Sequence, residues 1–456
     1  MKLEQLKNKK IAILWYWREG KSTLNFLLKL WLQTWNITIL DKSKVDINNI
    51  KSISWDNYLD WLDKYDLIFK SPWISPYNLK ELQKVKEKLI SQAEILADNF
   101  EWKIIWITWT KGKSTTSTLT YLALKELWYK VKLVWNIWNP VFDEIDLLSN
   151  EKYDFIIYEL SSFMLEWLDL KIYIWLLNNI YDCHLDWHEG RKNYQNAKFN
   201  IFNNAKYKLI WSELKSIIKN KDDKIFFGLT WKYYYKNKAF YISDKLVLED
   251  KNIALFWEHN KKNISWVLGI LDIINPDFDI NKFKKVLKDF SWLEHRQENI
   301  WVYKWITFIN DSIASTPESA IAAIKTFQNK IWTIFIWNED SWFDLEELKN
   351  TIKRYNIKNI VLFPVTWEKL FWDFSKDMSF DKKYKYLEDE FETNLYKTKS
   401  MEKAVKFAYN NTDIWEFVVL STWAPSFNAK WVWVMPWKSY IEKGNLFKKY
   451  VEKYWK

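Results

Sequence analysis

The stretch at 104–116, IIWITWTKGKSTT, constrains the fold more than any other part of this chain. Its apolar start, Ile104–Ile107, is typical of a buried strand, and Leu119, Leu122 and Leu127 follow at roughly helical spacing. A strand, a tight polar loop and a helix start form the layout in which backbone N–H groups bind phosphate oxygens. The stretch therefore predicts a phosphate site in an α/β domain.

The polar residues of this loop have the chemistry that a nucleoside triphosphate with Mg²⁺ requires. A lysine reaches the outer phosphates and a hydroxyl helps to hold the metal, and Lys113 with Ser114 or Thr115 would fill these roles. A bend that approaches phosphate closely needs small residues, yet Trp109 stands in the bend. An indole at this position would occupy the phosphate site.

Tryptophan recurs in this chain wherever glycine would be expected, as in WYWREG at 15–20 and WNIWNP at 135–140. The chain holds 34 Trp and 6 Gly, and the pooled counts restore an ordinary glycine content, which averages about 7%. A UGA stop codon that is reassigned to glycine but translated as tryptophan would give this pattern. We hypothesise that many of these tryptophans are glycine in the organism; a genuinely tryptophan-rich protein is the alternative.

The composition indicates a large intracellular protein. A chain of 456 residues is long enough for about three domains. The net charge is +10, but lysine is spread beside acidic residues without the dense basic blocks of a nucleic-acid arm. The lone Cys183 excludes an intramolecular disulfide, and neither a signal peptide nor a membrane-spanning run is found in the sequence. We expect a cytoplasmic monomer that binds no nucleic acid and does not span a membrane.

Strand-like and helix-like segments alternate over the first hundred residues. The strand Ile11–Leu14 precedes the turn at 15–20, and a helix is expected from Ser22 to Leu32. With Trp15 and Trp17 read as glycine the turn becomes G-x-G-x-x-G, and an aspartate, Asp41, ends the next strand about 20 residues on, as in a dinucleotide site. A simple strand–helix turn beside a solvent-facing aspartate is the alternative.

The middle of the chain carries several polar groups behind apolar runs. Glu159 follows the strand-like Phe155–Ile157, where a carboxylate beside a phosphate loop could hold Mg²⁺. His184 lies in CHLDWH; its spacing resembles metal ligation, but structural zinc would need a cysteine set. By itself Lys198 would be a solvated lysine. Asn260 and Asn263, at the start of a predicted helix, could face an adenine or only the backbone.

The last part of the chain alternates again and reads as another doubly wound α/β domain. Predicted strands lie at Ile306–Ile309, Ile331–Ile336, Ile360–Phe363 and Phe417–Leu420, with a helix from Pro317. Polar residues flank these strands: Arg296, Asp311 and the loop from Ser421 to Phe427. We expect three domains: a Rossmann-like domain at 1–98, a central P-loop ATPase-like domain with a parallel sheet at 99–292, and a Rossmann-like domain at 293–456.

Once tryptophan is read as glycine, these motifs in this order resemble the Mur ligase family over nearly the whole chain. The resemblance rests on SPGISP at 71–76, GTKGKST at 109–115, GNIGNP at 135–140, ELSSFMLE at 159–166, HLDGH at 184–188 with NYQNAK ending at Lys198, EHNKKN at 258–263, EHR at 294–296 and NDS at 310–312. The phosphate loop is shorter than the general G-x-x-x-x-G-K-[ST] form, because Ile107 stands at its first glycine, but it resembles the variant of this family.

The resemblance implies an ATP- and Mg²⁺-dependent ligase of peptidoglycan precursor synthesis. ATP would phosphorylate the carboxylate of UDP-N-acetylmuramoyl-L-alanine, and the amine of D-glutamate would attack the acyl phosphate. For ATP binding the implied residues are Thr110, Lys111, Gly112, Lys113, Ser114, Thr115, Asn260, Asn263, Arg296 and Asp311. For catalysis they are Lys113, Glu159, His184 and Lys198, with Ser114, Glu159, His184 and a carbamylated Lys198 at the metal. For the UDP substrate they are Trp15, Trp17, Asp41, Ser71 and Asn136, and for the amino acid Ser315, Ser421 and Phe427.

Two departures from the family pattern leave the added amino acid open. Ile313 stands where many relatives carry lysine, and Ser341 where a basic residue often helps to hold the incoming glutamate. A ligase that adds another amino acid, or one that polyglutamylates folate, is the nearest alternative, although folate chemistry needs no UDP site. A nicotinamide-dependent oxidoreductase would leave Lys113 and Glu159 unused. A non-catalytic nucleotide-binding homologue would follow if the tryptophans are real.

Overall fold

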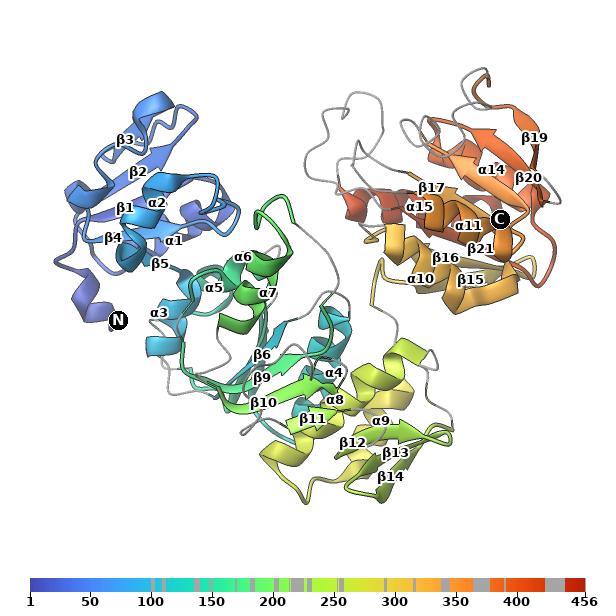
Figure 1. Ribbon diagram of the computed structural model, residues 1–456, viewed down its shortest axis with the longest axis horizontal. Helices are drawn as coiled ribbons and strands as arrows, with labels where there is room; N and C mark the ends of the chain where they lie inside the picture. Colours follow the sequence, from blue (N-terminus) through green and yellow to red (C-terminus); the bar gives the residue numbers. More distant parts are fainter. Residues whose placement is uncertain are drawn as a thin grey trace. The chain divides into compact units, whose positions relative to one another are not determined.

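The computed structural model describes most of the chain, and the statements below concern that part. The described residues are 1–99, 103–108, 112–134, 140–146, 148, 151–168, 170–180, 185–200, 205–212, 214, 225–227, 232–251, 253, 258–290, 293–314, 317–337, 345–363, 378–388, 391–422 and 439–455. They form three α/β domains, each with its own sheet (Figure 1). The chain divides into two compact units, Met1–Phe290 with the first two sheets and Ser291–Lys456 with the third.

The first domain is a five-stranded parallel sheet in the order β3-β2-β1-β4-β5. Its inner strands are short apolar runs that are buried on both faces, as helix-covered parallel sheets require. The strands are β1 (Ile11–Leu14), β2 (Ile37–Asp41), β3 (Lys51–Ser54), β4 (Leu67–Lys70) and β5 (Leu89–Ile90), and the helices are α1 (Arg18–Lys29), α2 (Lys80–Lys84) and α3 (Gln92–Asn99).

The second domain is built on a nine-stranded sheet in the order β14-β13-β12-β11-β10-β9-β6-β8-β7. Its strands are β6 (Lys103–Thr108), β7 (Val131–Val134), β8 (Phe155–Glu159), β9 (Ile172–Leu177), β10 (Ala205–Trp211), β11 (Ile225–Phe227), β12 (Tyr233–Lys236), β13 (Ala239–Ile242) and β14 (Lys245–Glu249). Its helices are α4 (Lys113–Glu126), α5 (Val141–Glu144), α6 (Ser162–Leu165), α7 (Arg191–Phe199), α8 (Glu258–Ile274) and α9 (Ile280–Asp289). The part from β7 to β12 is parallel, whereas β12, β13 and β14 form an antiparallel meander that the sequence patterns did not predict.

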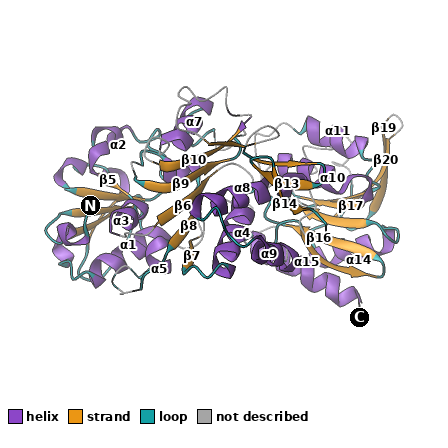
Figure 2. Cartoon of the chain, turned by 90° about the horizontal axis from the view of Figure 1, so that it is seen from below, coloured by secondary structure: helices purple, strands orange, loops and turns teal. Residues whose placement is uncertain are grey.

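The third domain contains a seven-stranded sheet in the order β15-β16-β21-β17-β18-β20-β19. Its inner strands are parallel, and β15 and β19 pair antiparallel at the two edges. The strands are β15 (Glu298–Tyr303), β16 (Ile306–Asp311), β17 (Ile331–Ile336), β18 (Asn359–Leu362), β19 (Lys383–Glu388), β20 (Phe391–Lys397) and β21 (Phe417–Ser421). The helices are α10 (Pro317–Phe327), α11 (Glu346–Arg354), α14 (Met401–Asn411) and α15 (Tyr440–Trp455), and Figure 2 shows helices and strands alternating in this part as in the others.

The first and second sheets are joined by a shared apolar core and by hydrogen bonds. The rings of Phe26 on α1 and Phe142 on α5 stack with centroids 4.0 Å apart. The Ser22 hydroxyl lies 2.8 Å from an Asp143 carboxylate oxygen, and the backbone N–H of Phe142 donates to the side-chain oxygen of Gln92 on α3 at 3.3 Å. These contacts hold the first sheet against the phosphate-loop domain, so the two sheets can present one common site.

The predicted strands agree with the structure to within a residue or two, and the predicted helix from Pro317 begins there. One difference matters for the site. Helix α1 begins at Arg18 rather than Ser22 and ends at Lys29 rather than Leu32. The end of the 15–20 turn is therefore the first turn of the helix, which apolar spacing alone does not reveal. Within the described residues, no helix has the length and apolarity that a membrane crossing would take.

Candidate functional site

The predicted UDP-substrate residues of the first domain gather at one edge of its sheet. Leu14 ends β1, with Leu40 and Lys70 as its neighbours in β2 and β4. The turn at 15–20, Asp41 and Ser71 therefore lie at the carboxyl ends of adjacent strands. Open α/β sheets bind ligands at this edge, where the strand order reverses. In this sheet the reversal falls between β1 and β4.

The turn at 15–20 has the backbone geometry of a glycine turn. Trp15 adopts a φ of 76°, in the left-handed region that favours glycine. A Cβ added to Gly20 would lie 2.4 Å from the Trp15 carbonyl oxygen, so only glycine fits there. Asp41 is buried, and its carboxylate accepts from the backbone N–H of Tyr16 at 2.7 Å and of Ser43 at 2.8 Å. Asp41 therefore holds the turn in place.

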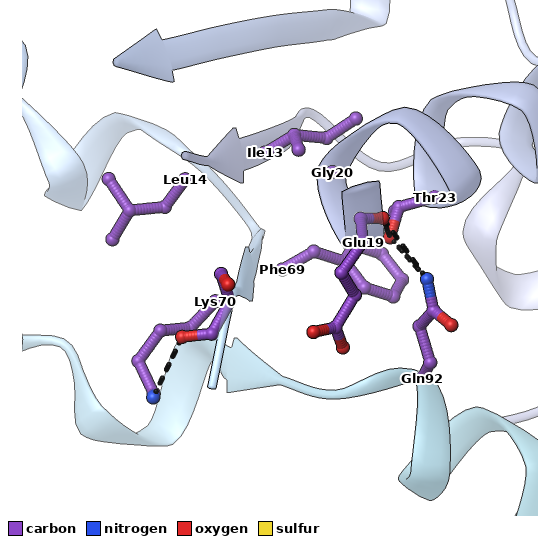
Figure 3. Close-up of a pocket in the computed structure, with 9 residues that line it drawn as sticks. Ile13, Leu14, Glu19, Gly20, Thr23, Phe69, Lys70 and Gln92 are labelled. Carbon is purple, nitrogen blue, oxygen red and sulfur yellow. Dashed lines mark hydrogen bonds between the residues drawn. The ribbon is translucent and has the colours of Figure 1, made fainter. Parts of the chain in front are cut away.

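A small pocket between β1 and β4 contains a carboxyl group and an amine that sequence reasoning did not single out (Figure 3). Glu19 and Lys70 line it together with Ser71 and Gln92. Burial raises the pKa of Glu19 to about 8 and lowers the pKa of Lys70 to about 8, and each charge partly opposes the shift of the other. The Lys70 amine donates to the Ser71 carbonyl at 3.2 Å and to the Ile74 carbonyl at 3.0 Å, so it braces the turn that follows β4.

A buried carboxylate lies on the strand next to the one that precedes the predicted phosphate loop. Gly112 has a φ of 103°, and α4 starts at the next residue, Lys113. Ile107 in β6 is the ladder partner of Glu159 in β8, and the backbone N–H of Leu160 donates to the Ile107 carbonyl at 3.1 Å. Glu159, only 3% exposed, is thus fixed beside the strand that leads into the loop. Thr110 and Lys111 lie outside the described residues.

The other predicted residues of the central domain are placed in part. Lys198 on α7 is 2% exposed, although by itself it was expected to be a solvated lysine, and its amine lies 5.0 Å from the centre of the Tyr194 ring. Asn260 and Asn263 on α8 are also buried, and the Asn263 side-chain Nδ2 donates to the Asn260 side-chain Oδ1 at 3.1 Å. His184 and Asn136 lie outside the described residues. Among the described residues, no three His, Cys, Asp or Glu side chains cluster as a metal site.

The third domain brings two of its predicted residues together. Asp311 ends β16 and Ser421 ends the adjacent β21, and the Ser421 hydroxyl donates to the Asp311 carboxylate at 3.2 Å. The other carboxylate oxygen accepts from the Gln297 N–H at 3.1 Å, which fixes the segment that carries Arg296. Ser315 and Phe427 lie outside the described residues, as does Ser341.

The tryptophans repeatedly occupy glycine backbone positions. Eight of the twenty non-glycine residues with positive φ among the described residues are tryptophan: Trp15, Trp31, Trp55, Trp61, Trp128, Trp167, Trp305 and Trp415. Another, Trp106, is fully buried in β6, and its indole N–H has no hydrogen-bond partner in the described structure. A positive φ is uncommon for any residue with a Cβ, and an unpaired buried N–H is costly.

Two of these tryptophans close α1 and α4, the helices that follow the 15–20 turn and the predicted phosphate loop. At the end of α1, the N–H of Trp31 donates to the Leu28 carbonyl, and the next N–H donates to the Leu27 carbonyl. Trp128 and Tyr129 make the same pair of bonds at the end of α4. This is the Schellman motif, whose left-handed position is usually glycine. The end of α11 uses the same motif with asparagine, at Asn356.

Comparison with known proteins identifies the class to which this fold and site belong. Residues 107–271 match the family model described as the Mur ligase middle domain. The crystal structure of the MurF ligase from Thermotoga maritima in complex with ADP superposes with a TM-score of 0.58 over 99% of this chain and 97% of that chain. At 14% identity this likeness shows the fold alone.

Curated relatives narrow the class. The UDP-N-acetylmuramoylalanine–D-glutamate ligase of Clostridium botulinum strain Hall is 30% identical over 477 residues, which cover 98% of this chain and 97% of that protein. The enzyme of the same name from strain Alaska E43 is 29% identical over 94% of this chain and 93% of that protein. The chain therefore belongs to the Mur ligase family, among relatives that carry this name.

Proposed function

We propose that this protein joins D-glutamate to UDP-N-acetylmuramoyl-L-alanine at the expense of ATP, as the names of its full-length relatives suggest. The proposal is carried by a helix that starts at Lys113 after β6, whose strand partner β8 ends in the buried Glu159, in a chain that matches those relatives over 98% of its length. The product is a precursor of peptidoglycan, which places the enzyme in the cytoplasm. A monomer is sufficient for this chemistry.

The reaction has two steps. A carboxylate oxygen of the muramoyl-alanine attacks the γ-phosphorus of ATP, the bond to the β-phosphate oxygen breaks, and ADP leaves. The amine of D-glutamate then attacks the carbonyl carbon of the acyl phosphate, phosphate leaves with the C–O bonding electrons, and the amine gives up its proton as the amide forms. Phosphoryl transfer depends mainly on positioning and charge neutralisation, and these are the tasks of Lys113 and of the N–H groups at the start of α4.

The donor set fits Mg²⁺. The Ser114 hydroxyl lies in the first turn of α4, and the Glu159 carboxylate is buried at the end of the neighbouring strand; both are oxygen ligands of the kind that Mg²⁺ prefers. Bound Mg²⁺ would neutralise the charge of the phosphates. The burial of Lys198 is in keeping with a place at the metal, because a carbamate formed on its amine would supply oxygen ligands of the kind that Mg²⁺ prefers. His184 completes the proposed set.

Binding of the other substrate groups is assigned by sequence position. The edge of the first sheet, with the 15–20 turn, Asp41 and Ser71, takes the uridine nucleotide, and Asn136 takes the sugar-peptide end. Thr110, Lys111 and the Asn260–Asn263 pair complete the ATP contacts, joined by Arg296 and Asp311 of the third domain. Ser315, Ser421 and Phe427 take the amino acid. Ile313 stands where many relatives carry lysine. A ligase that adds a different amino acid is therefore the second candidate.

Glycine at the tryptophan positions is part of the proposal. Positive φ at eight tryptophans and the two Schellman ends support it, because these positions are made for residues without a Cβ. At the phosphate loop, glycine at position 109 would let the backbone approach the phosphates. A stop codon that is read as glycine in the host accounts for all of these positions at once.

The test is to compare two proteins in one assay. One is the chain as printed, and the other carries glycine at the eight positive-φ tryptophans and at Trp73, Trp106 and Trp109. Each is mixed with ATP, Mg²⁺, UDP-N-acetylmuramoyl-L-alanine and D-glutamate, and ADP release is followed with and without each substrate. We expect the glycine form to release ADP only when all substrates are present and the printed form to be inactive.

The alternatives predict other results. ADP release with L-lysine or another amino acid, but not with D-glutamate, would move the proposal to a different ligase. Equal turnover by the printed form would show that the tryptophans are compatible with catalysis. Peptide mass spectrometry of the protein from its own host, on the tryptic peptide that spans Ile104–Lys111, reads positions 106 and 109 directly.

A further inference from the structure

A buried carboxylate, Glu166, joins segments that come from two domains. Its Oε1 accepts from the Tyr77 hydroxyl at 2.8 Å, and its Oε2 lies 3.2 Å from Nδ1 of His188. Glu166 is 8% exposed and His188 is fully buried. Tyr77 belongs to the segment after β4, whereas His188 precedes α7 in the central domain. One side chain therefore contacts both domains.

Further contacts hold the same segments together. The other ring nitrogen of His188, Nε2, lies 2.9 Å from the Ser162 hydroxyl, next to the start of α6. The Ser75 hydroxyl donates across the domain boundary to the backbone carbonyl of residue 187 at 2.6 Å. Asn193 on α7 donates to the His188 carbonyl at 2.8 Å. None of these three contacts uses an indole.

Each of the connected segments carries a residue that the proposed function uses. The segment at 71–77 begins with Ser71, the segment at 159–166 begins with Glu159, and α7, which follows His188, carries Lys198. A hydrogen bond to a buried charged group contributes more than one to a neutral group. Tyr77, Glu166 and His188 are therefore placed to fix the distance between the uridine-substrate edge and the phosphate loop.

We propose that Glu166 is a positioning residue, and that its bonds to Tyr77 and His188 form a clamp that holds the substrate turn at 71–77 against the phosphoryl-transfer site. The inference rests on the proposed function for the identity of the substrate. The clamp fixes where the muramoyl carboxylate lies relative to the γ-phosphate, and a small displacement of reacting groups is costly in rate. Glu166 itself touches neither reacting atom.

The experiment uses Tyr77→Phe in the full chain, in whichever of the two sequences releases ADP. This change removes one hydroxyl and keeps the ring. We expect the KM for UDP-N-acetylmuramoyl-L-alanine to rise about tenfold, with the KM for ATP changed less than about twofold. Glu166→Gln should likewise raise the KM for UDP-N-acetylmuramoyl-L-alanine and leave the KM for ATP nearly unchanged, because an amide lacks the charge that both partners contact. A residue that serves only stability would lower the active fraction and leave both KM values unchanged.

Two matched variants make the result decisive. Tyr234→Phe removes a comparable hydrogen bond, from Tyr234 to Asp244 at 2.8 Å on an exposed part of the β12–β13 hairpin, and should leave both KM values unchanged. Ser75→Ala removes the hydrogen bond from the same substrate turn to the backbone carbonyl of residue 187. This variant keeps the proposal testable if Tyr77→Phe does not fold. An unchanged KM for the uridine substrate in both Tyr77→Phe and Ser75→Ala would overturn the proposal.

A second readout separates this proposal from the proposed function. Hydrogen exchange of the backbone at 71–77 should be faster in Tyr77→Phe than in the parent, with or without turnover. If neither parent sequence releases ADP but exchange at 71–77 accelerates, the clamp stands and the proposed function fails. If the parent is active and neither exchange nor KM responds, the clamp fails alone.

Discussion

The two strand–turn–helix units that begin the first and second domains are built alike but have different electrostatics. In each, a buried strand, β1 or β6, is followed by a helix that ends in a Schellman motif with tryptophan at the left-handed position. The first turn is held by Asp41 and opens onto a pocket where burial shifts Glu19 and Lys70 towards their neutral forms. In the second, α4 begins at Lys113 and β6 pairs with the strand that ends in the buried Glu159.

The difference shows how one backbone layout serves two tasks. In the first turn, burial favours the neutral forms of the ionisable neighbours, so a nucleotide can be bound there by backbone hydrogen bonds and by the shape of the turn. A turn with a lysine at the helix start and a carboxylate for a metal can neutralise charge that develops during phosphoryl transfer. We therefore assign recognition to the first strand–turn–helix unit and chemistry to the second.

The largest effect is expected at Lys113, in the second unit. Lys113→Ala removes the cation at the start of α4, and we expect kcat for ADP release to fall about 10³-fold, the loss typical for a group that stabilises transition-state charge. Lys125→Ala, an exposed lysine in the last turn of the same helix, is the matched control and should retain full activity. A Lys113→Ala protein with normal kcat and a raised KM for the uridine substrate would reverse the division between the units.

A smaller effect is expected at the shared helix ends. Trp128 has a φ of 71° and is 84% exposed, so Trp128→Gly relieves a left-handed strain of roughly 1–2 kcal/mol while losing little packing. After the entropic cost of glycine, we expect the free energy of unfolding to rise by about 0.5–1 kcal/mol in urea denaturation. Trp35→Gly, also exposed but without positive φ, should be destabilising by a similar amount. If both variants changed the free energy of unfolding in the same direction, the glycine hypothesis would be contradicted.

Much of the fold follows from short-range patterns in the sequence. The apolar runs at Ile11–Leu14 and Ile331–Ile336 are strands with those bounds, because a strand buried on both faces is apolar throughout. The meander from β12 to β14 was missed, since its strands carry tyrosine and lysine on partly exposed faces. Helix α1 was placed four residues too late, because its first turn, Arg18 to Gly20, is polar and belongs to the nucleotide turn.

Site residues can be predicted from the sequence only where they stand at a recognisable position relative to a strand or a motif. Lys113 and Glu159 could be found from the sequence, because each follows an apolar strand that ends at the same edge of one sheet. Glu166 stands seven residues after Glu159 in the same motif, but its importance depends on Tyr77, 89 residues away in the chain. The pKa of Glu19 depends on burial in a pocket formed by three separate segments. Contacts of this kind arise when segments far apart in the sequence pack together, and no local pattern in the sequence encodes them.

A further predicted effect concerns the pocket of the first unit and its pH dependence. The pKa of Glu19 is raised from 4.5 to about 8, so between pH 5 and 8 the folded protein holds a proton that the unfolded chain has released. Stability therefore falls as the pH rises through this window. Glu19→Gln removes the titration, and we expect wild type to lose about 1–2 kcal/mol relative to this variant from pH 5 to pH 8, less than the full shift because Glu19 is partly exposed.

The experiment follows thermal or urea unfolding of both proteins at several pH values. Glu87→Gln, an exposed carboxylate of the same domain, is the control, and its stability should run parallel to that of wild type. Lys70 acts in the opposite sense: its pKa is lowered to about 8, so above pH 8 the folded amine is neutral while the unfolded one is charged, and stability should rise with pH up to about 10. A wild-type profile parallel to Glu19→Gln would mean that Glu19 is ionised at neutral pH. The first unit would then carry charge as the second does, and recognition there would include an ion pair with Lys70.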